Sequence, residues 1–224
     1  MKRIAFILCF IVSGGLEAQD CAGYYFMQGN KTVEMTLYKK DGDENGKQVY
    51  TVSNVSKTAT GMTSVVNSEL FNKKGKSTAK GTNNMECTGG VFKVDLKMMI
   101  APEQQKQLAN GTAQGENMYL EYPSTMKAGD DLKDGNMHLD MKVNNMDETV
   151  DLNIISRKVT GKESVTSPAG TWDCFRITFV SKMQIKVMGI GVPVTIEGTE
   201  WYAPGFGVVK SESKYGTTLI TSIK

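Results

Sequence analysis

The chain has 224 residues, with 26 basic against 24 acidic side chains, one histidine and four cysteines. A formal net charge of +2 is too small to predict nucleic acid or an acidic membrane as the partner. The single histidine and the lack of a Cys-x-x-Cys motif give no support to a transition-metal centre or a thioredoxin-like redox pair.

The N-terminus has the pattern of a secretory signal peptide. A basic start precedes an apolar run over residues 4–12, and a small residue, Ala18, provides the cleavage site. The run is shorter than the roughly 20 apolar residues that span a bilayer, so we predict no transmembrane anchor. We expect residues 1–18 to be removed and residues 19–224 to form one exported domain. The predicted location is the periplasm or the outside of the cell, with outer-membrane association as a further option.

Three cysteines remain after this cleavage, namely Cys21, Cys87 and Cys174. An oxidising compartment favours a disulfide between two of them, and the sequence leaves all three pairings open. Cys21 with Cys87 is favoured because both flank the first half of the chain. Asp20, rather than a small residue, precedes Cys21, which disfavours lipoprotein acylation at that cysteine.

Apolar and polar side chains alternate along most of the remaining chain. The alternation is regular over residues 33–37, 137–143, 150–154 and 175–187, and it resumes over residues 192–196. A period of two places one side of each strand on a core and the other side in water. Short turns rich in Gly, Asn and Asp separate the runs, and such turns join antiparallel neighbours.

About ten long strands, each apolar on one side, cannot form a stable flat sheet. We predict an all-β single domain in which a strongly curved antiparallel sheet forms a half-barrel or open barrel. One short helix is expected near residues 102–108, where Pro102 stands at a first-turn position and Gly111 follows the end. The strand over residues 175–187 is long enough to need a bend, which we place at Ser181.

Two polar motifs have both a chemical and a structural interpretation. Asp41, Asp43 and Asn45 match the opening of a calcium-binding loop. Val52 stands where the bidentate Glu should be, so a hairpin turn is favoured and a weak calcium site is the alternative. His138 lies at a polar position of its strand, which predicts a solvent-facing side chain. No nucleophile motif accompanies this histidine, so we predict no catalytic residue, no cofactor and no other metal site.

Two long segments carry a family resemblance: ISRKVTGKESVTSPAGTWDCFRITF over residues 155–179 and EWYAPGFGVVKSES over residues 200–213. Two more are similar, CAGYYFMQGNKTVEMTLYKKDG near the N-terminus and CTGGVFKVDLKMMI in the middle of the chain. The chain resembles the TapB-like family of exported Gram-negative proteins, which carries a domain of unknown function. The resemblance implies no activity, cofactor or catalytic residue. It implies a distant likeness to the LolA/LolB-like lipoprotein-carrier fold, a half-barrel that holds acyl chains under short helices.

We therefore expect a non-enzymatic exported protein that binds a hydrophobic ligand, such as a lipid, an acyl chain or a lipoprotein, in the concave face of the sheet. The chain has 14 methionines, several at inward-facing positions, which either fill the core or give that face an adaptable lining. The alternative is an envelope interaction module that binds a protein partner through a sheet edge or a surface aromatic such as Trp201.

Overall fold

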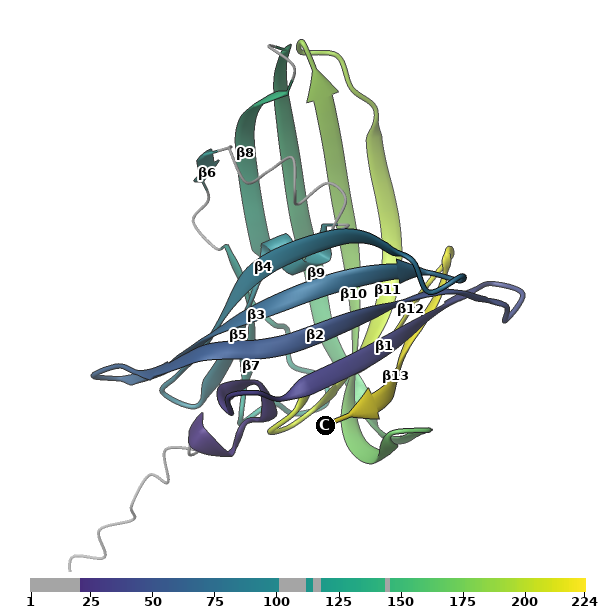
Figure 1. Ribbon diagram of the computed structural model, residues 1–224. Helices are drawn as coiled ribbons and strands as arrows, with labels where there is room; N and C mark the ends of the chain where they lie inside the picture. Colours follow the sequence, from purple (N-terminus) through teal and green to yellow (C-terminus); the bar gives the residue numbers. More distant parts are fainter. Residues whose placement is uncertain (1–20, 101–111, 115–117, 144–145) are drawn as a thin grey trace, which may run out of the picture.

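The computed structural model describes residues 21–100, 112–114, 118–143 and 146–224, which form one antiparallel sheet of 13 strands (Figure 1). The strands are β1 (Thr32–Lys39), β2 (Glu44–Lys57), β3 (Gly61–Asn72), β4 (Ser77–Thr88), β5 (Val91–Asp95), β6 (Thr112–Gln114), β7 (Tyr119–Pro123), β8 (Gly135–Val143), β9 (Met146–Ser167), β10 (Gly170–Val187), β11 (Pro193–Ala203), β12 (Gly207–Ser213) and β13 (Gly216–Ile223). Short 3-10 helices accompany them: η1 (Cys21–Gly23), η2 (Tyr25–Met27) and η3 (Leu96–Met99). Within these described ranges, no helix has the length and apolar content needed to cross a bilayer.

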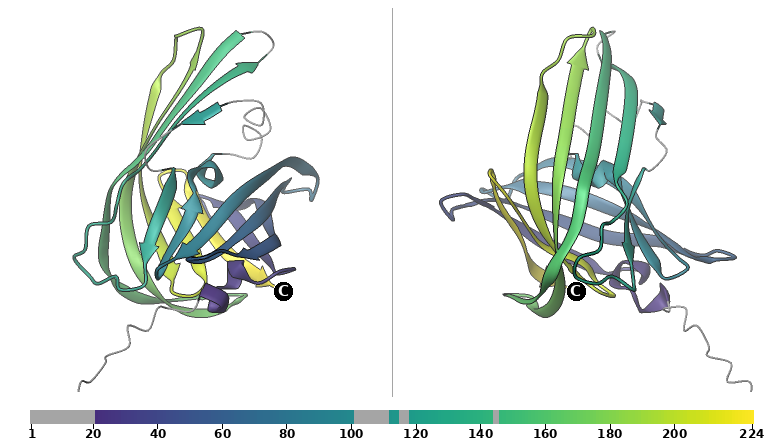
Figure 2. Two further views of the ribbon diagram at one scale, coloured as in Figure 1. Left: turned by 90° about the vertical axis from the view of Figure 1, so that its left-hand side faces the viewer. Right: turned by 180° about the vertical axis from the view of Figure 1, so that it is seen from behind.

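The sheet curls until its two ends approach each other. Its strand order is β6-β8-β9-β10-β11-β12-β13-β1-β2-β3-β4-β5-β7. The segment after β7 then bonds to β9: the backbone amides of Gly129 and Leu132 donate to the carbonyls of Val159 and Arg157, at 2.7 and 2.8 Å. These bonds form a closure seam between β7 and β9, and the result is a nearly closed barrel (Figure 2).

Strands β8, β9, β10 and β11 run past the barrel and form an extension that we call the blade (Figure 2). β9 and β10 are the longest strands of the sheet, with 22 and 18 residues, and their pairing continues from the barrel into the blade. The blade consists of β8 together with residues 146–155 of β9, 180–187 of β10 and 193–197 of β11.

The change from barrel to blade coincides with a bulge in the pairing of β9 with β10. Two residues of β9, Ser156 and Arg157, stand opposite the single Phe179 of β10. Ser156 has a φ of 55°, which is uncommon for a residue other than glycine. A bulge of this kind bends the strand and increases its twist. It lies two residues from Ser181, where the sequence predicted the bend.

The predicted all-β class, antiparallel pairing and strong curvature are confirmed. The sheet has 13 strands rather than about ten because β5, β6 and β7 hold only 5, 3 and 5 residues, too few to show a clear alternation. The helix predicted near residues 102–108 and the signal peptide predicted over residues 1–18 lie outside the described residues, so both stay predictions.

A disulfide joins Cys21 to Cys87, the pairing that the sequence favoured. It ties η1 to β4 across a sequence separation of 66 residues. In the loop-entropy account, a crosslink of this span stabilises the fold by about 4 kcal/mol. With its sulfur in the disulfide, Cys21 is not available for acylation. Cys174 is free and buried, and burial raises the pKa of its thiol to about 12.

Candidate binding cavity

The barrel contains an apolar cavity of about 320 Å³. Ligand pockets typically fall between about 300 and 1,000 Å³, so the cavity is large enough for a small ligand. Side chains from β1, β2, β4, β5, β7 and β10 to β13 contribute to its wall. Four methionines take part, and their unbranched, polarisable side chains allow the wall to adapt. They are Met35, Met85, Met98 and Met99, beside the apolar residues Phe26, Val33, Phe92, Val94, Leu120, Phe179 and Val208.

The wall also includes a buried carboxylate, Glu200 of β11. The hydroxyl of Tyr122 donates to this carboxylate, at 3.0 Å from Oε1 and 3.2 Å from Oε2. Nη2 of Arg157 lies 3.5 Å from Oε1. The three residues are almost inaccessible, with Tyr122 and Arg157 each 1% exposed and Glu200 3% exposed. We call Tyr122, Arg157 and Glu200 the polar corner; Tyr122 and Glu200 face the cavity.

Arg157 reaches the interior because of the bulge in β9. In an unbroken alternation its side chain would face outward, and the extra residue, Ser156, turns it inward. Its Nη1 donates to the backbone carbonyls of Glu121 at 3.2 Å and Lys133 at 3.0 Å. Its guanidinium carbon lies 4.8 Å from the centroid of the Tyr122 ring, in a cation–π contact. Arg157 therefore connects Tyr122 and Glu200 to the backbone of β7 and of the segment that follows it, beside the closure seam.

Burial dominates the ionisation of the polar corner. It raises the pKa of Glu200, although the nearby charge of Arg157 acts in the opposite direction. Burial also raises the pKa of Tyr122 well above its ordinary value, and the charge of Glu200 adds to this shift. Tyr122 is thus a neutral donor. Ionised Glu200 has about four acceptor sites, more than Tyr122 and Arg157 use.

Stacked aromatic rings hold the polar corner in place. The rings of Tyr122 and Tyr202 have centroids 4.4 Å apart and planes 3° from parallel. Phe92 lies 6.5 Å from Tyr202 and stacks on Tyr24 at 4.9 Å. Contacts of this kind add to the free energy of burial. The stack connects β7, β11 and β5 with the segment between η1 and η2, so Tyr122 has little freedom to turn away from the cavity.

Two further cavities adjoin the apolar one. A cavity of about 380 Å³ shares Met99, Phe179, Ser211 and Thr218 with it. A more open cavity of about 840 Å³ shares Phe179 with both. Phe179 therefore stands where the three spaces meet, at the base of the blade.

The position of Phe179 depends on Gly198 of β11. The Phe179 ring lies directly over this glycine, and a Cβ added to Gly198 would come within 2.4 Å of the ring atom Cζ. Glycine in a strand interior often marks such a close approach. Gly198 thus leaves room for the ring at the junction of the cavities.

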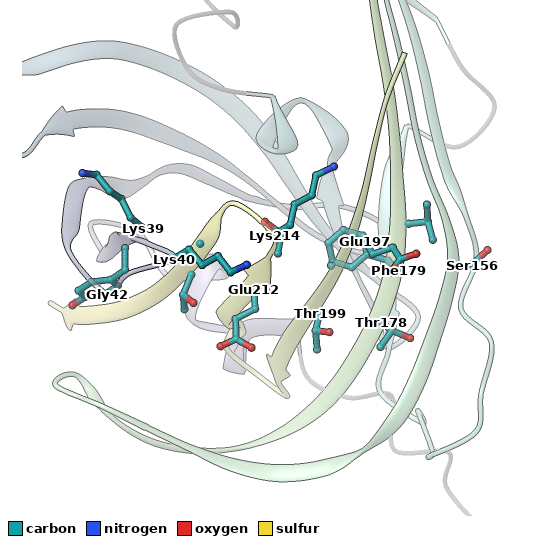
Figure 3. Close-up of a pocket in the computed structure, with 16 residues that line it drawn as sticks. Lys39, Lys40, Gly42, Ser156, Thr178, Phe179, Glu197, Thr199, Glu212 and Lys214 are labelled. Atoms are coloured by element: carbon teal, nitrogen blue, oxygen red, sulfur yellow. The ribbon is translucent and has the colours of Figure 1, made fainter. Parts of the chain in front are cut away.

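The open cavity has a polar rim (Figure 3). Residues of the β1–β2 and β12–β13 turns face residues of β10 and β11 across it. The rim carries both signs of charge, from Lys39, Lys40 and Lys214 and from Glu197 and Glu212. Charged groups at this opening can stay hydrated, in contrast to the buried charges of the polar corner.

The candidate calcium ligands lie in the β1–β2 turn. The backbone amide of Asp43 donates to Oδ1 of Asp41 at 3.1 Å, and Asn45 already belongs to β2. The φ of Gly42 is 90°, a conformation that a hairpin turn requires and glycine permits. In the part of the chain that the structure describes, no group of three His, Cys, Asp or Glu side chains is placed to hold a metal ion. The turn accounts for these residues, and the calcium alternative stays a prediction of the sequence.

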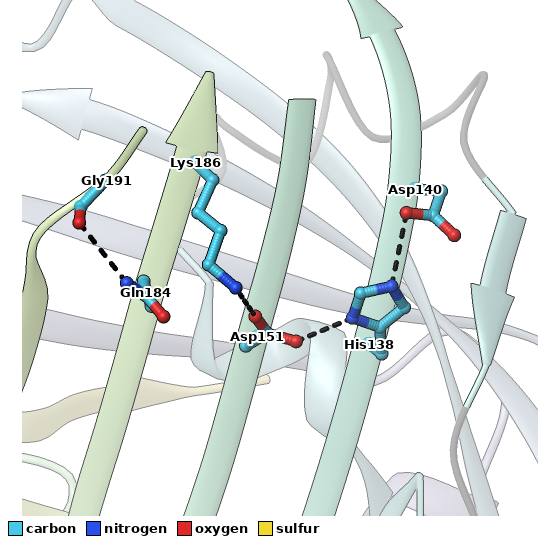
Figure 4. A network of polar contacts seen from close by, with 6 residues as sticks. All are labelled: His138, Asp140, Asp151, Gln184, Lys186 and Gly191. Carbon is cyan, nitrogen blue, oxygen red and sulfur yellow. Dashed lines mark hydrogen bonds and ion pairs between the residues drawn. The ribbon is translucent and has the colours of Figure 1, made fainter. Parts of the chain in front are cut away.

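His138 belongs to a ladder of polar contacts on the solvent side of the blade (Figure 4). Its Nδ1 lies 2.6 Å from Oδ1 of Asp151, and its Nε2 lies 3.1 Å from Oδ1 of Asp140. Lys186 donates to Oδ2 of Asp151 at 3.1 Å. The hydrogen bond with Asp151 is the largest cause that raises the pKa of His138. The side chain is 44% exposed, in agreement with the predicted solvent-facing position.

Trp201 is not the surface aromatic that the sequence suggested. It is only 7% exposed. The ammonium group of Lys210 lies 4.2 Å from a ring centroid of the indole, whose N–H donates to Glu163. The prediction was wrong because alternation assigns a side chain to a face but does not show which neighbours cover that face.

Sequence patterns did not identify Tyr122, Arg157 or Glu200 as site residues. One signal was present for Glu200, which shares its parity in β11 with Ile196 and Tyr202 and so places a charge in the inward-facing series. A charge at such a position requires a partner. No comparable signal identified Arg157, because its inward orientation depends on the bulge.

Fold and cavity together define a nearly closed antiparallel β-barrel with an apolar interior space. The chain belongs to the DUF3108-like family, which it matches over residues 28–221. The comparisons do not confirm the TapB-like family name or the LolA/LolB-like likeness that the sequence suggested. No curated protein matches the chain.

Two solved structures share the fold. One is a predicted exported protein with a YmcC-like fold from Bacteroides fragilis, which is 24% identical, with 90% of this chain and 98% of that chain covered and a TM-score of 0.70. The other is a predicted lipoprotein from Parabacteroides distasonis, which is 22% identical, with 92% and 100% covered and a TM-score of 0.71. At these identities the likeness shows a common fold and nothing about ligands.

Proposed function

We propose that this chain is an exported envelope protein that binds an apolar ligand in the barrel cavity and does not catalyse a reaction. The predicted signal peptide supports export, as do the descriptions of the two structural relatives, one as an exported protein and one as a lipoprotein. The location that follows is the periplasm, the envelope or the outside of the cell.

The observation that carries the proposal is an apolar, methionine-lined cavity with a hydrogen-bonding corner. Apolar lining supplies binding free energy at about 25 cal/mol per Å² of surface removed from water. Glu200 lines the cavity, and its carboxylate has more acceptor sites than Tyr122 and Arg157 use, which favours a ligand end group that donates hydrogen bonds. The ligand class that fits is an aliphatic chain ending in a hydroxyl or ammonium group.

A competition experiment tests this ligand class. A fluorescent single-chain lipid probe is bound to the full chain and displaced by dodecanol, dodecylammonium or dodecanoate. We expect the alcohol and the amine to compete at about tenfold lower concentration than the acid, because a second carboxylate would be repelled by Glu200. Glu200→Gln should abolish this preference, whereas Glu197→Gln at the open rim should retain it. Failure of the probe to bind, or equal displacement by all three, would contradict the proposal.

A protein partner at a sheet edge is the second candidate, and one observation favours it. Residues 193–197 of β11 pair with β10 on one side and with no described strand on the other. Two features of this edge discourage strand addition: Pro193 lacks a backbone N–H, and Lys214 donates to the carbonyl of Thr195 at 3.2 Å. A photo-crosslinker at Thr195 that captured one envelope protein in cells, and lost it after Val194→Pro, would favour this candidate over the cavity.

A further inference from the structure

The far end of the blade presents apolar side chains to solvent. In the β10–β11 hairpin, Met188, Ile190 and Val192 are 72%, 83% and 79% exposed. Val187 is 37% exposed, and Met146 at the start of β9 is 40% exposed. Single exposed apolar residues are ordinary, but a concentration of them marks an interaction site. We call Met146 and residues 187–192 the blade tip.

The composition of the tip is apolar beyond what its turn requires. Residues 187–192 read VMGIGV, without one polar side chain. The two glycines serve the backbone: Gly189 has a φ of 80°, and a Cβ on Gly191 would come within 2.1 Å of the Ile185 carbonyl oxygen. Of the other four residues, Met188 also has a positive φ, of 51°, which Gly, Asn or Asp would adopt more readily than methionine. Polar side chains would suit an exposed turn better. Their apolar character therefore needs another explanation.

Several backbone groups of the tip are hydrogen-bonded within the blade. Val187 and Ile190 exchange two backbone bonds of 2.9 and 3.0 Å, and the amide of Met188 donates to the carbonyl of Asp147 at 2.8 Å. The carbonyl of Gly191 accepts a hydrogen bond from the side-chain amide of Gln184 in β10, as Figure 4 shows. These bonded groups suit a lipid environment, which offers no partners to backbone donors and acceptors, and they are not available for pairing with another strand.

Charged side chains begin next to the tip, and two ion pairs are among them. Lys142 lies 3.7 Å from Asp147, and Lys186 lies 3.1 Å from Asp151. Glu148, opposite Val187 in the pairing of β9 with β10, adds a further negative charge, so this level of the blade has no excess of positive charge. The contact we infer therefore depends on apolar burial rather than on attraction to anionic lipids.

The tip is also continuous with the route to the barrel. Met183 and Ile185 of β10 share one side of the blade with Val194 and Ile196 of β11, and all four are half-buried. Ile196 and Phe179 line the cavity of about 380 Å³ that adjoins the apolar cavity. An apolar surface therefore leads from the tip to the interior, which suits a lipid partner better than a folded protein.

We propose that the blade tip inserts into the surface of a lipid bilayer. Met188, Ile190 and Val192 enter the acyl-chain boundary, and the charged pairs remain among the headgroups. The contact is independent of whether the cavity holds a ligand, so each proposal can fail without the other.

A reporter at the tip tests the insertion. Ile190→Cys in the chain from residue 19 onward, which lacks Cys9, is labelled with an environment-sensitive fluorophore. The disulfide of Cys21 with Cys87 and the burial of Cys174 keep the labelling selective. We expect a blue shift on adding phosphatidylcholine vesicles and quenching when their acyl chains are brominated. The same label at Tyr215→Cys, a 61% exposed position on the β12–β13 turn, should show neither change. An unchanged emission at position 190 with millimolar lipid would overturn the proposal.

Vesicle flotation of unlabelled variants gives the second arm. Ile190→Asn should lower partitioning about tenfold, because one apolar side chain no longer leaves water, and the exposed position leaves folding intact. Tyr215→Asn should have no effect. Binding that Ile190→Asn does not weaken would overturn the proposal and point to another part of the chain. A change at position 190 that depends on protein concentration without lipid would also overturn it, in favour of a second copy of the chain.

Discussion

The barrel and the blade are built partly from the same strands, yet they treat charge in opposite ways. In the barrel, the Arg157–Glu200 pair is almost inaccessible, with side chains 0% and 4% exposed. In the blade, the ion pairs of Asp151 with His138 and Lys186 involve side chains that are 30% to 44% exposed. Exposed pairs contribute at most about 1 kcal/mol, whereas breaking a buried pair costs several. The depth of a pair below the surface, rather than its identity, decides what it contributes.

The bulge in β9 marks the boundary between the buried ion pair of the barrel and the exposed ion pairs of the blade. On the blade side of Ser156, the alternation of β9 runs undisturbed and its polar residues face water. At the bulge, Arg157 changes face and becomes a buried partner of the closure seam and of the cavity. One extra residue thus converts a strand that continues into the blade into part of a closed interior.

The largest expected effect comes from breaking the buried pair. Arg157→Met should lower the free energy of unfolding by about 3–5 kcal/mol at pH 7, because Glu200 would remain buried without its partner. The loss should shrink as the pH falls through the raised pKa of Glu200, since a protonated carboxyl needs no counter-charge. Urea denaturation followed by tryptophan fluorescence measures both effects. Adding Glu200→Gln should recover part of the loss, and a loss below about 1 kcal/mol for Arg157→Met would show that the pair is not desolvated.

Removing the disulfide should cost nearly as much. Cys87→Ser is expected to destabilise the fold by about 4 kcal/mol through the freed loop, and reduction of the unmodified chain should reproduce the change. Cys174→Ala serves as the control, because it removes a buried cysteine that forms no disulfide. Equal unfolding midpoints for the reduced and oxidised chains would contradict the contribution of this crosslink to the barrel.

A smaller effect is expected where the barrel meets the blade. Gly198→Ala should cost about 1–3 kcal/mol, because the new Cβ displaces the Phe179 ring. Phe179→Leu in the same chain should relieve part of that cost. Gly161→Ala is the matched control, since nothing lies within 4 Å of its added Cβ. Thermal denaturation compares the three, and a loss of the same size at both glycines would mean that contact with the ring is not the cause.

The smallest effect is expected in the blade. Asp151→Asn should lower the free energy of unfolding by less than about 1 kcal/mol, because its partners are exposed. The raised pKa of His138 determines how this contribution to the free energy of unfolding depends on pH. The stabilisation from protonated His138 is present below the ordinary pKa of histidine and is lost as the pH rises through the raised value. The difference between the unmodified chain and Asp151→Asn should therefore be larger at pH 6 than at pH 9. A loss above about 2 kcal/mol would erase the contrast between blade and barrel.

Sequence periodicity predicted the features of this molecule that depend on which face a side chain occupies. The long run of β10, the part of β9 over residues 150–154, the curvature and the bend near Ser181 all follow from alternation and strand length. The short strands β5, β6 and β7 did not, because five residues or fewer carry little periodic information.

Sequence periodicity did not predict the polar corner. Arg157 faces inward only because a bulge shifts its register, and Tyr122 lies on one of the short strands. Trp201 was misplaced for a related reason, since its covering by Lys210 comes from a neighbouring strand rather than from its own sequence. Periodicity predicts which face of its own strand a side chain occupies, whereas a binding site depends on contacts between side chains of different strands.

The most direct test of the central claim, that the barrel holds an apolar ligand, is native mass spectrometry of the protein isolated from cells. The unmodified chain is expected to carry one small apolar molecule. Val208→Trp, which fills the cavity, should not carry it, whereas Val49→Trp on the opposite face of β2 from Gln48 should retain it. The mass of the bare polypeptide for all three proteins, or the same bound molecule on Val208→Trp, would contradict the account.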